Sequence, residues 1–297
     1  DAKTYLKKYR VTDDQILNTD VSYNVFDNRS YYIFRGLSFQ DLRPLHNNKT
    51  TPAALPLIDM HYESDSKTLF SKMHLDVNFL NLSRPQGVNY QRMVTTAALS
   101  KQAILPYGQL VKVKGSVRGD VYYTQKKPII VTDTPAKLNN ALEGYETRGY
   151  PELNAEWSFP VYRTFSNSSV LILEPVVNPI ISAYTTNLEK IADEDSKSPE
   201  ISAYNLFSSN RYKGYDKIES GNRLNYGIRG NLISPWMRNL NFLIGQSVRA
   251  KKDYNFQKSS GMDGLRSDYV SKISLQPTEH VFINNNSRYD EDDLSLQ

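Results

Sequence analysis

The chain contains no cysteine among its 297 residues. It therefore has no disulfide, no thiolate nucleophile and no cysteine metal ligand. Long apolar runs are also missing, and stretches such as Ala53–Ile58 and Ile129–Val131 fall far short of the roughly 18 residues that a transmembrane helix needs. Helical membrane spans are thus excluded. A soluble all-β protein and a transmembrane β-barrel, in which only every second residue must be apolar, both stay open.

Histidine is scarce, with 4 in the chain. His46, His61, His74 and His280 are isolated in the sequence, and none has a ligand partner at a helical or strand spacing. We therefore expect scattered polar residues rather than a metal site or a general base. Serine is common, but no Ser–His pairing is evident, so no nucleophilic catalyst is expected. The sequence predicts neither an enzyme nor a cofactor.

Tyrosine dominates the aromatic residues, with 21 Tyr against 11 Phe and 2 Trp. Rings that carry a polar group suit the boundary between membrane and water, where one end of the side chain is dry and the other wet. Strands of any kind also favour tyrosine. The composition therefore favours a membrane-embedded sheet over a soluble one without deciding between them.

The segment from residue 223 to residue 232 alternates strictly between two kinds of side chain. A period of two indicates a strand, because successive side chains leave opposite faces of the pleat. One parity is apolar or aromatic and the other is polar, as expected for a strand with lipid on one side and a wet lumen on the other. The two sets are Leu224, Tyr226, Ile228 and Leu232 against Arg223, Asn225, Arg229 and Asn231.

Candidate strands recur along the whole chain, and short turns between them alternate with long polar connections. The connection Pro106–Gly108 is short, whereas Thr124–Gly149, Thr185–Ala203 and Lys251–Arg266 are long. This alternation is typical of outer-membrane barrels, and the spacing predicts an all-β fold, an antiparallel transmembrane β-barrel with roughly 14 strands. The strands expected from the pattern include Ile16–Phe26, Ser30–Phe39, Leu55–Glu63, Lys72–Leu82, Tyr90–Leu105, Gln109–Tyr123, Glu152–Val161, Ser169–Val177, Arg223–Ile233, Leu240–Arg249, Tyr269–Leu275 and Val281–Arg288.

The charge balance is basic, with a net charge of +4 and a pI of about 8.9. Arg223 and Arg229 share one strand face and are candidate lumen residues, where guanidinium groups could pair with phosphates. Alternatively, acids such as Asp216 and Glu219 balance these charges and hold loops inside a barrel. The sequence leaves both interpretations open. Nucleic-acid binding is not expected, because acids are interspersed and no binding motif is present.

The acidic run Asp193–Asp195 offers hard oxygen ligands for Ca²⁺ or Mg²⁺. It lacks the alternate-position spacing and the glycine of a calcium loop. We therefore expect a solvated loop rather than a metal site.

An ordered string of residues from 205 to 219 resembles the central signature of the LptD family, the outer-membrane barrels that assemble lipopolysaccharide at the cell surface. It reads Asn-Leu-Phe, then Asn-Arg, then Gly-Tyr-Asp-Lys-Ile-Glu, and an upstream Glu-Pro pair and an acidic Asp-Ser stretch add to the likeness. The resemblance implies a structural or lumen role for Glu174, Pro175, Asp195, Asn205, Leu206, Phe207, Asn210, Arg211, Gly214, Asp216 and Glu219.

The resemblance also implies an architecture and partners. Similar proteins have a periplasmic jellyroll domain, a very large barrel and an LptE-type lipoprotein plug inside the barrel. Lipopolysaccharide arrives along an LptA-type periplasmic bridge and leaves through a lateral seam. Residues 1–297 are then expected to be an interior part of the barrel domain, with the jellyroll and the seam strands lying outside this chain.

On this basis the expected function is lipopolysaccharide transport and insertion into the outer leaflet of the Gram-negative outer membrane, without covalent chemistry and without nucleic acid. The phosphates that Arg223 and Arg229 would meet are then those of lipid A. The alternatives are a general outer-membrane porin or receptor-type channel, or a soluble all-β carbohydrate-binding module.

Overall fold

The computed structural model describes residues 15–43, 47–65, 72–127, 143–185, 191, 193–197 and 199–297. These residues form one antiparallel sheet of 13 strands. The strands are β1 (Ile16–Asp27), β2 (Ser30–Asp41), β3 (Ala53–Asp65), β4 (Lys72–Ser83), β5 (Gly87–Ile104), β6 (Leu110–Lys127), β7 (Gly144–Ser158), β8 (Val161–Thr164), β9 (Val170–Ser182), β10 (Arg223–Ile233), β11 (Asn239–Arg249), β12 (Tyr269–Gln276) and β13 (Ile283–Tyr289).

Three short 3-10 helices lie in the described connections, at Asn48–Thr50, Pro106–Gly108 and Lys258–Ser260. In this part of the chain no helix has the length and apolar character needed to cross a membrane.

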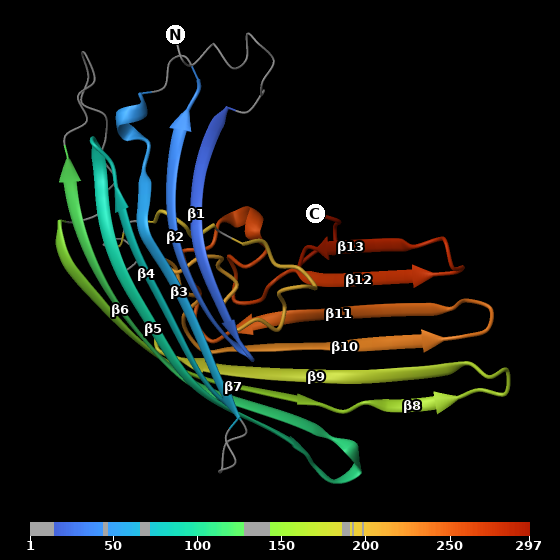
Figure 1. Ribbon diagram of the computed structural model, residues 1–297. Coiled ribbons are helices and arrows are strands. Elements are labelled where there is room, and N and C mark those ends of the chain that lie inside the picture. The colour runs from blue at the N-terminus through green and yellow to red at the C-terminus, as the bar shows by residue number, and fades with distance from the viewer. Residues whose placement is uncertain are drawn as a thin grey trace.

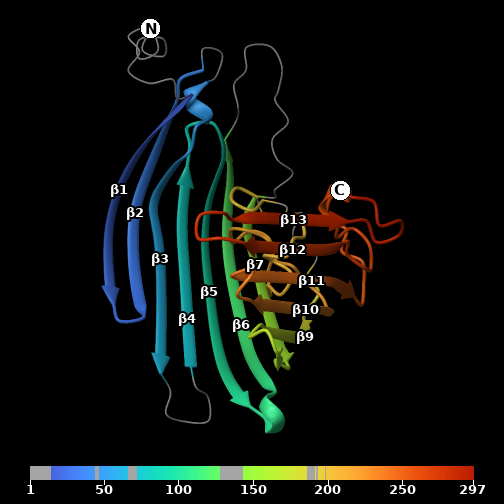
Figure 2. The ribbon, with the colours of Figure 1, turned by 90° about the vertical axis from the view of Figure 1, so that its right-hand side faces the viewer.

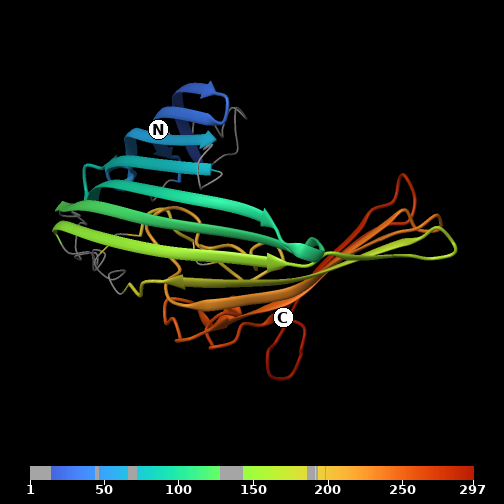
Figure 3. The ribbon, with the colours of Figure 1, turned by 90° about the horizontal axis from the view of Figure 1, so that it is seen from below.

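Strands that follow one another in the chain are neighbours in the sheet, except that the short β8 pairs only with β9. The sheet curves strongly, so that β1–β7 and β9–β13 run in different directions around one concave side (Figure 1). Figures 2 and 3 show the same open, curved wall from the side and from below, with β1 and β13 as its two edges. The predicted all-β antiparallel fold is confirmed, with 13 strands in the described residues against the roughly 14 expected.

Most predicted hairpins match the structure closely, but the predicted loop Thr124–Gly149 is partly wrong. Strand β6 continues to Lys127 and β7 begins at Gly144, eight residues before the predicted start at Glu152. Residues 144–151 include no aliphatic side chain, so their sequence pattern resembles a loop. Its pairing with β6 and the burial of Arg148 against the inner face make it a strand.

The two faces of the sheet have opposite chemistry, and the apolar face is the exposed one. On β10, Leu224, Tyr226 and Ile228 are 39%, 37% and 45% exposed, while Arg223 and Asn225 are 4% and 0% exposed. A soluble sheet buries its apolar face. The observed inversion is what a sheet facing hydrocarbon needs, and it confirms the predicted division of this strand into two faces.

Two long connections lie on the concave side of the sheet (Figures 1 and 2). We call residues 193–197 and 199–222, between β9 and β10, the inner loop. The second connection joins β11 to β12. Between these connections and the strands lies an apolar cluster of Ile201, Leu206, Tyr212, Phe256, Met262 and Val270.

Candidate functional site on the concave face

Asp216 of the inner loop is fixed to strand β5 by two strong hydrogen bonds. The Tyr90 hydroxyl donates to its Oδ1 at 2.5 Å, and Nη1 of Arg92 donates to the same oxygen at 2.7 Å. The other oxygen, Oδ2, accepts the backbone N–H groups of Glu194 and Asp195 at 2.9 and 3.2 Å. This carboxylate therefore ties two parts of the loop to the wall of the sheet.

Asp195 completes the same junction from the other side. Its Oδ1 accepts the backbone N–H groups of Tyr215 and Asp216 at 3.1 and 3.2 Å, and Nη2 of Arg92 lies 2.6 Å from its Oδ2. Gly214 has φ +83°, and a Cβ atom there would lie 2.5 Å from Oδ1 of Asp195. The backbone conformation and the close contact both require glycine at this position.

Strands β6 and β7 contribute a second row of charges beneath the loop. Arg118 and Arg148 both pair with Asp120. Arg148 also donates to the backbone carbonyl of Asp216 at 2.9 Å, and Arg118 donates to that of Tyr215. The guanidinium groups thus satisfy the loop carbonyls, and the Tyr122 hydroxyl also donates to that of Tyr215 at 3.3 Å. Together these contacts form the Asp216 network.

The Asp216 network contains as many ionisable acids as arginines. The environment shifts the pKa values of the two loop acids, Asp216 and Asp195, in opposite directions. Burial raises the pKa of Asp216 to about 6, with the negative charge of Asp195 adding to the rise and Arg92 opposing it. Burial also acts to raise the pKa of Asp195, but the hydrogen bond and the charge of Arg92 outweigh it and lower that pKa.

Glu219 is the centre of a second buried network. Nη1 of Arg211 lies 2.5 Å from its Oε1, Nε of Arg223 lies 3.4 Å from the same oxygen, and Arg249 contacts it as well. Burial would raise the pKa of Glu219, but the three guanidinium groups hold it below its usual range. The pKa of Arg211 falls to about 10, because burial and the charges of Arg223 and Arg249 outweigh Glu219.

Arg211 also organises the beginning of the signature. Its Nη2 donates to the Leu206 carbonyl and to Oδ1 of Asn225, both at 2.8 Å, and its Nε donates to the Asn205 carbonyl at 3.2 Å. Oδ1 of Asn210 accepts the backbone N–H of Glu219 at 3.0 Å. These contacts and those of Glu219 form the Glu219 network, which folds the loop onto β10 and β11.

The remaining residues at the start of the signature shape the loop by packing and turn contacts. Oδ1 of Asn205 accepts the backbone N–H of Ser202 at 2.9 Å, which fixes a turn. Leu206 is fully buried, and a Cβ atom at Gly245 of β11 would lie 2.5 Å from its Cδ2 atom. The absence of a side chain at Gly245 therefore makes room for Leu206.

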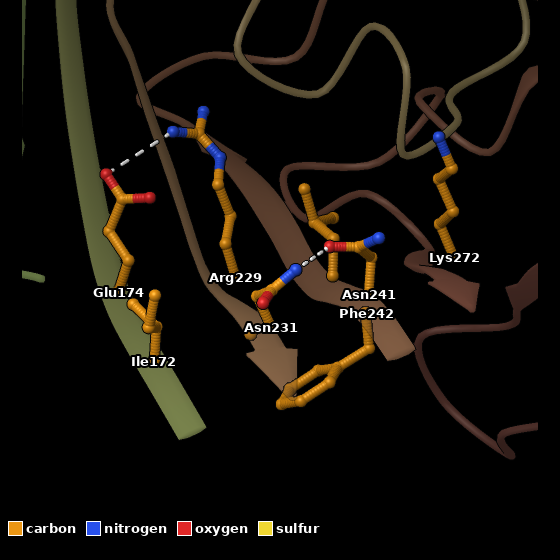
Figure 4. A pocket seen from close by; sticks show the side chains of 9 residues that line it. Ile172, Glu174, Arg229, Asn231, Asn241, Phe242 and Lys272 are labelled. Carbon is orange, nitrogen blue, oxygen red and sulfur yellow. Dashed lines mark hydrogen bonds and ion pairs between the residues drawn. The ribbon is translucent and has the colours of Figure 1, made fainter. Parts of the chain in front are cut away.

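Accessible cations lie next to these buried networks. Arg229 faces Leu243 across β10 and β11, and Leu243 faces Lys272, so the three side chains share one row of the sheet. Arg229 Nη1 lies 3.7 Å from Oε1 of Glu174, and its guanidinium lies over the Phe207 ring at 4.8 Å. Figure 4 shows Arg229 and Lys272 at a cavity of about 330 Å³.

A second cavity of about 350 Å³ has four lysines at its wall, Lys72, Lys101, Lys112 and Lys114. Lys72 and Lys114 both lie opposite Ser100, on β4 and β6, so they share a face of the sheet. Phe207 contributes to this cavity and to the Arg229 contact, which brings the two sites together. The concave face therefore carries two basic hollows beside one another.

The structure separates the two arginines that the sequence grouped together. Arg223 is covered by the inner loop, whereas the Arg229 side chain is 35% exposed. Contact of either with phosphate stays a prediction, and Arg229 is the one that a ligand can reach. Pro175 lies on β9 opposite Ile228, and its carbonyl accepts the backbone N–H of Phe159 at 3.2 Å.

The acidic run Asp193–Asp195 is paired with cations. Asp193 contacts Lys217 at 2.5 Å and Glu194 contacts Arg84 at 2.9 Å. With Asp195 bound to Arg92, the run has a structural role at the foot of the inner loop.

Sequence reasoning missed the strand residues that receive the loop, notably Tyr90, Arg92, Asp120 and Arg148. The sequence alternation could have indicated that these side chains lie on the inner face of their strands. Their contacts with a distant loop are visible only in the fold.

His61 and His74 are distant in the sequence, but the structure brings them together on the paired strands β3 and β4, with Glu63 opposite His74. His280 is exposed in the β12–β13 turn, and His46 lies outside the described residues.

A curved antiparallel sheet with an exposed apolar outer face, and with its own loops bound to a charged inner face, is the wall of an outer-membrane β-barrel. Residues 2–297 match the family described as "LptD: LPS transport system D", and the chain belongs to that family. It is thus a lipopolysaccharide transport protein of the Gram-negative outer membrane, rather than a general porin or a soluble carbohydrate-binding module.

No curated protein matches the chain. The crystal structure of BamA from Haemophilus ducreyi lacking POTRA domains 1-3 is similar, with 8% identity and a TM-score of 0.32. The match covers 96% of this chain and 69% of the other.

Proposed function

We propose that the acidic head group of lipopolysaccharide moves along the concave face and contacts its accessible cations. We call Lys72, Lys112, Lys114, Arg229 and Lys272 the basic strip. The observation that supports the proposal is the contrast between these partly or fully exposed cations and the buried arginines next to them. Ammonium and guanidinium groups make charge-assisted hydrogen bonds to phosphate, and the strip offers both kinds.

The ion pairs of the basic strip are compatible with this role. Lys112 lies 3.5 Å from Glu156 and Arg229 lies 3.7 Å from Glu174, with both cations accessible. Exposed pairs of this kind contribute about 0–1 kcal/mol, so an anionic ligand can compete for the cations at low cost. The nearby acids also keep each contact weak enough for the ligand to move on.

The signature residues then have a supporting role. The Asp216 and Glu219 networks fix the inner loop against β5–β7 and β10–β11, which sets the width of the wet path and positions Phe207 between the two hollows. Residues with buried partners would act on transport through the shape of the lumen rather than by contact with the lipid.

We also propose that residues 1–297 are part of a larger barrel domain with a separate periplasmic jellyroll and further strands at the seam. Among the described residues, no strand pairs with the outer edge of β1 or of β13, apart from one bridge from Tyr289 to Leu296. These edges support the proposal, because backbone groups in hydrocarbon must find hydrogen-bond partners. An LptE-type lipoprotein plug would occupy the remaining concave space, and an LptA-type bridge would deliver the lipid. The work is transport without covalent chemistry.

The test reverses the charge of two residues of the basic strip, with Arg229→Glu and Lys272→Glu combined in one variant. The matched control is Arg238→Glu, an exposed arginine in the β10–β11 turn that pairs with Glu279. We expect the double variant to fold normally, as judged by gel mobility with and without heating, and to display less lipopolysaccharide at the cell surface than the control. Normal surface lipopolysaccharide in a folded double variant would contradict the proposal.

A further inference from the structure

We propose that His61, Glu63 and His74 form a zinc-type metal site on the concave face of the β3–β4 hairpin. Ligand atoms of the three side chains lie within 4.8 Å of one another. Two imidazoles and a carboxylate are a ligand set that binds Zn²⁺ in proteins and leaves the fourth position open. This inference does not rest on the proposed path of the lipid, although Lys72 of the basic strip contacts Glu63.

The strand register brings the three residues together. His61 and Glu63 are two positions apart on β3 and therefore point to the same face. Glu63 lies directly opposite His74, and His61 lies directly opposite Asp76. The outward neighbours Tyr62, Met73 and Leu75 are exposed on the apolar face, so the histidines and acids point to the concave side.

Neighbouring groups leave a suitable nitrogen of each histidine free for a metal. Oδ1 of Asp76 lies 2.6 Å from Nδ1 of His61, which holds the proton there and leaves Nε2 as a ligand atom. The Ser100 hydroxyl lies 3.3 Å from Nε2 of His74, and the other nitrogen, Nδ1, faces Oε2 of Glu63 at 3.4 Å. A carboxylate behind a ligating histidine is the usual outer partner of a zinc site.

The ion would need only small side-chain movements. Two ligand atoms that share a tetrahedral zinc at about 2.0–2.1 Å lie roughly 3.3 Å apart. The Glu63–His74 pair already meets this spacing at 3.4 Å. The three ligand atoms already lie within 4.8 Å of one another, and stacking on Tyr31 with 5.2 Å between ring centroids holds the His61 ring in this position.

Two cations now contact Glu63, and metal binding would replace them. Nζ of Lys72 and Nη1 of Arg29 lie 2.7 and 3.4 Å from Oε1 of Glu63, and both side chains are about half exposed. Both contacts use Oε1, while Oε2 faces His74. The carboxylate can therefore bind a metal through Oε2, and the two half-exposed cations can turn toward solvent.

A metal at this position would join β3 to β4 beside the connection at residues 66–71. It would also present its open position to the lumen, where it can take an oxygen ligand. Removal of one ligand should weaken zinc binding by more than about tenfold, since loss of an outer partner alone costs about 10–100-fold.

The test is zinc binding by the purified, folded full-length barrel protein that contains this chain, in detergent, measured by competition with a chromogenic chelator. We expect one Zn²⁺ per chain, and we expect the His61→Gln and His74→Gln double variant to lose it while His280→Gln keeps it. Cobalt in place of zinc should give the intense visible bands of a four-coordinate site. X-ray absorption should show nitrogen and oxygen ligands near 2.0–2.1 Å.

Equal zinc affinity in wild type and the double variant would overturn the assignment, as would the absence of bound zinc in the wild type. Folding of each variant is checked by heat-dependent gel mobility. If the double variant does not fold, Glu63→Gln and His74→Gln as single variants decide the question, because each must bind zinc more weakly than His280→Gln.

Discussion

Replacement of Glu219 by glutamine removes the carboxylate that Arg211, Arg223 and Arg249 share, while the side chain keeps its size. All four groups are almost completely buried. Breaking a buried ion pair by removing one partner costs about 3–5 kcal/mol, because the other charge stays buried and unbalanced. Here three guanidinium groups lose their acid at once. The amide oxygen can still accept one hydrogen bond, so we expect a loss of about 3 kcal/mol in the free energy of unfolding.

The assay is a urea titration of the chain in lipid vesicles, followed by tryptophan fluorescence and by heat-dependent gel mobility. The control is Glu279→Gln, which breaks the ion pair with Arg238 at the protein surface and should change stability by about 0–1 kcal/mol. Adding Arg249→Gln to the Glu219→Gln variant should restore part of the loss, because it removes one of the unbalanced charges.

A Glu219→Gln variant within about 1 kcal/mol of the Glu279→Gln control would refute the account of the Glu219 network. The same conclusion would follow if Arg249→Gln lowered the free energy of unfolding of the Glu219→Gln variant by as much as it lowers that of the wild type. The effects of independent sites add, whereas those of coupled sites do not.

Three further predictions concern the loop, its acids and the outer face. Gly245→Ala should lower stability by about 1–3 kcal/mol in the same titration, because its Cβ atom would overlap both the Tyr226 carbonyl oxygen and the Leu206 side chain, whereas Gly119→Ala, with open space around it, should be neutral. The pKa of Asp216 is about 6 in the folded chain and about 4 when unfolded, so its contribution is full below about pH 4 and is lost as pH rises through 6. Wild type should therefore lose up to roughly 3 kcal/mol relative to Asp216→Asn between pH 4 and pH 7, and parallel pH profiles would contradict this. Val117→Arg, on the exposed apolar face, should reduce stability in vesicles by about 2–4 kcal/mol, and an unchanged urea midpoint would mean that this face does not contact lipid.

The sequence predicts the strands of the curved sheet better than the loops that pack on its concave side. Alternation in Arg223–Ile233 is sufficient to predict both the strand and its two faces, because one side contacts hydrocarbon and must be apolar. Gly144–Gly149 lacks such a pattern, so the sequence predicts a loop there. Pairing with β6 makes this segment a strand instead.

The candidate site was predictable only in part. The signature identified the residues of the inner loop, but not that Asp216 binds Arg92 and Tyr90, because those contacts join positions more than a hundred residues apart. His61 and His74 came together for a similar reason, since strand register rather than local spacing sets their distance.

Passage of lipopolysaccharide along the concave face can be tested by site-specific photo-crosslinking of pulse-labelled lipid in cells. The crosslinker is placed at Lys114 on the concave face, or at the neighbouring Val113 on the exposed outer face. We predict that position 114 captures labelled lipid early and loses it during the chase, while position 113 gains it only later, once the lipid has reached the membrane. Capture at position 113 with none at position 114 at any time would contradict the account.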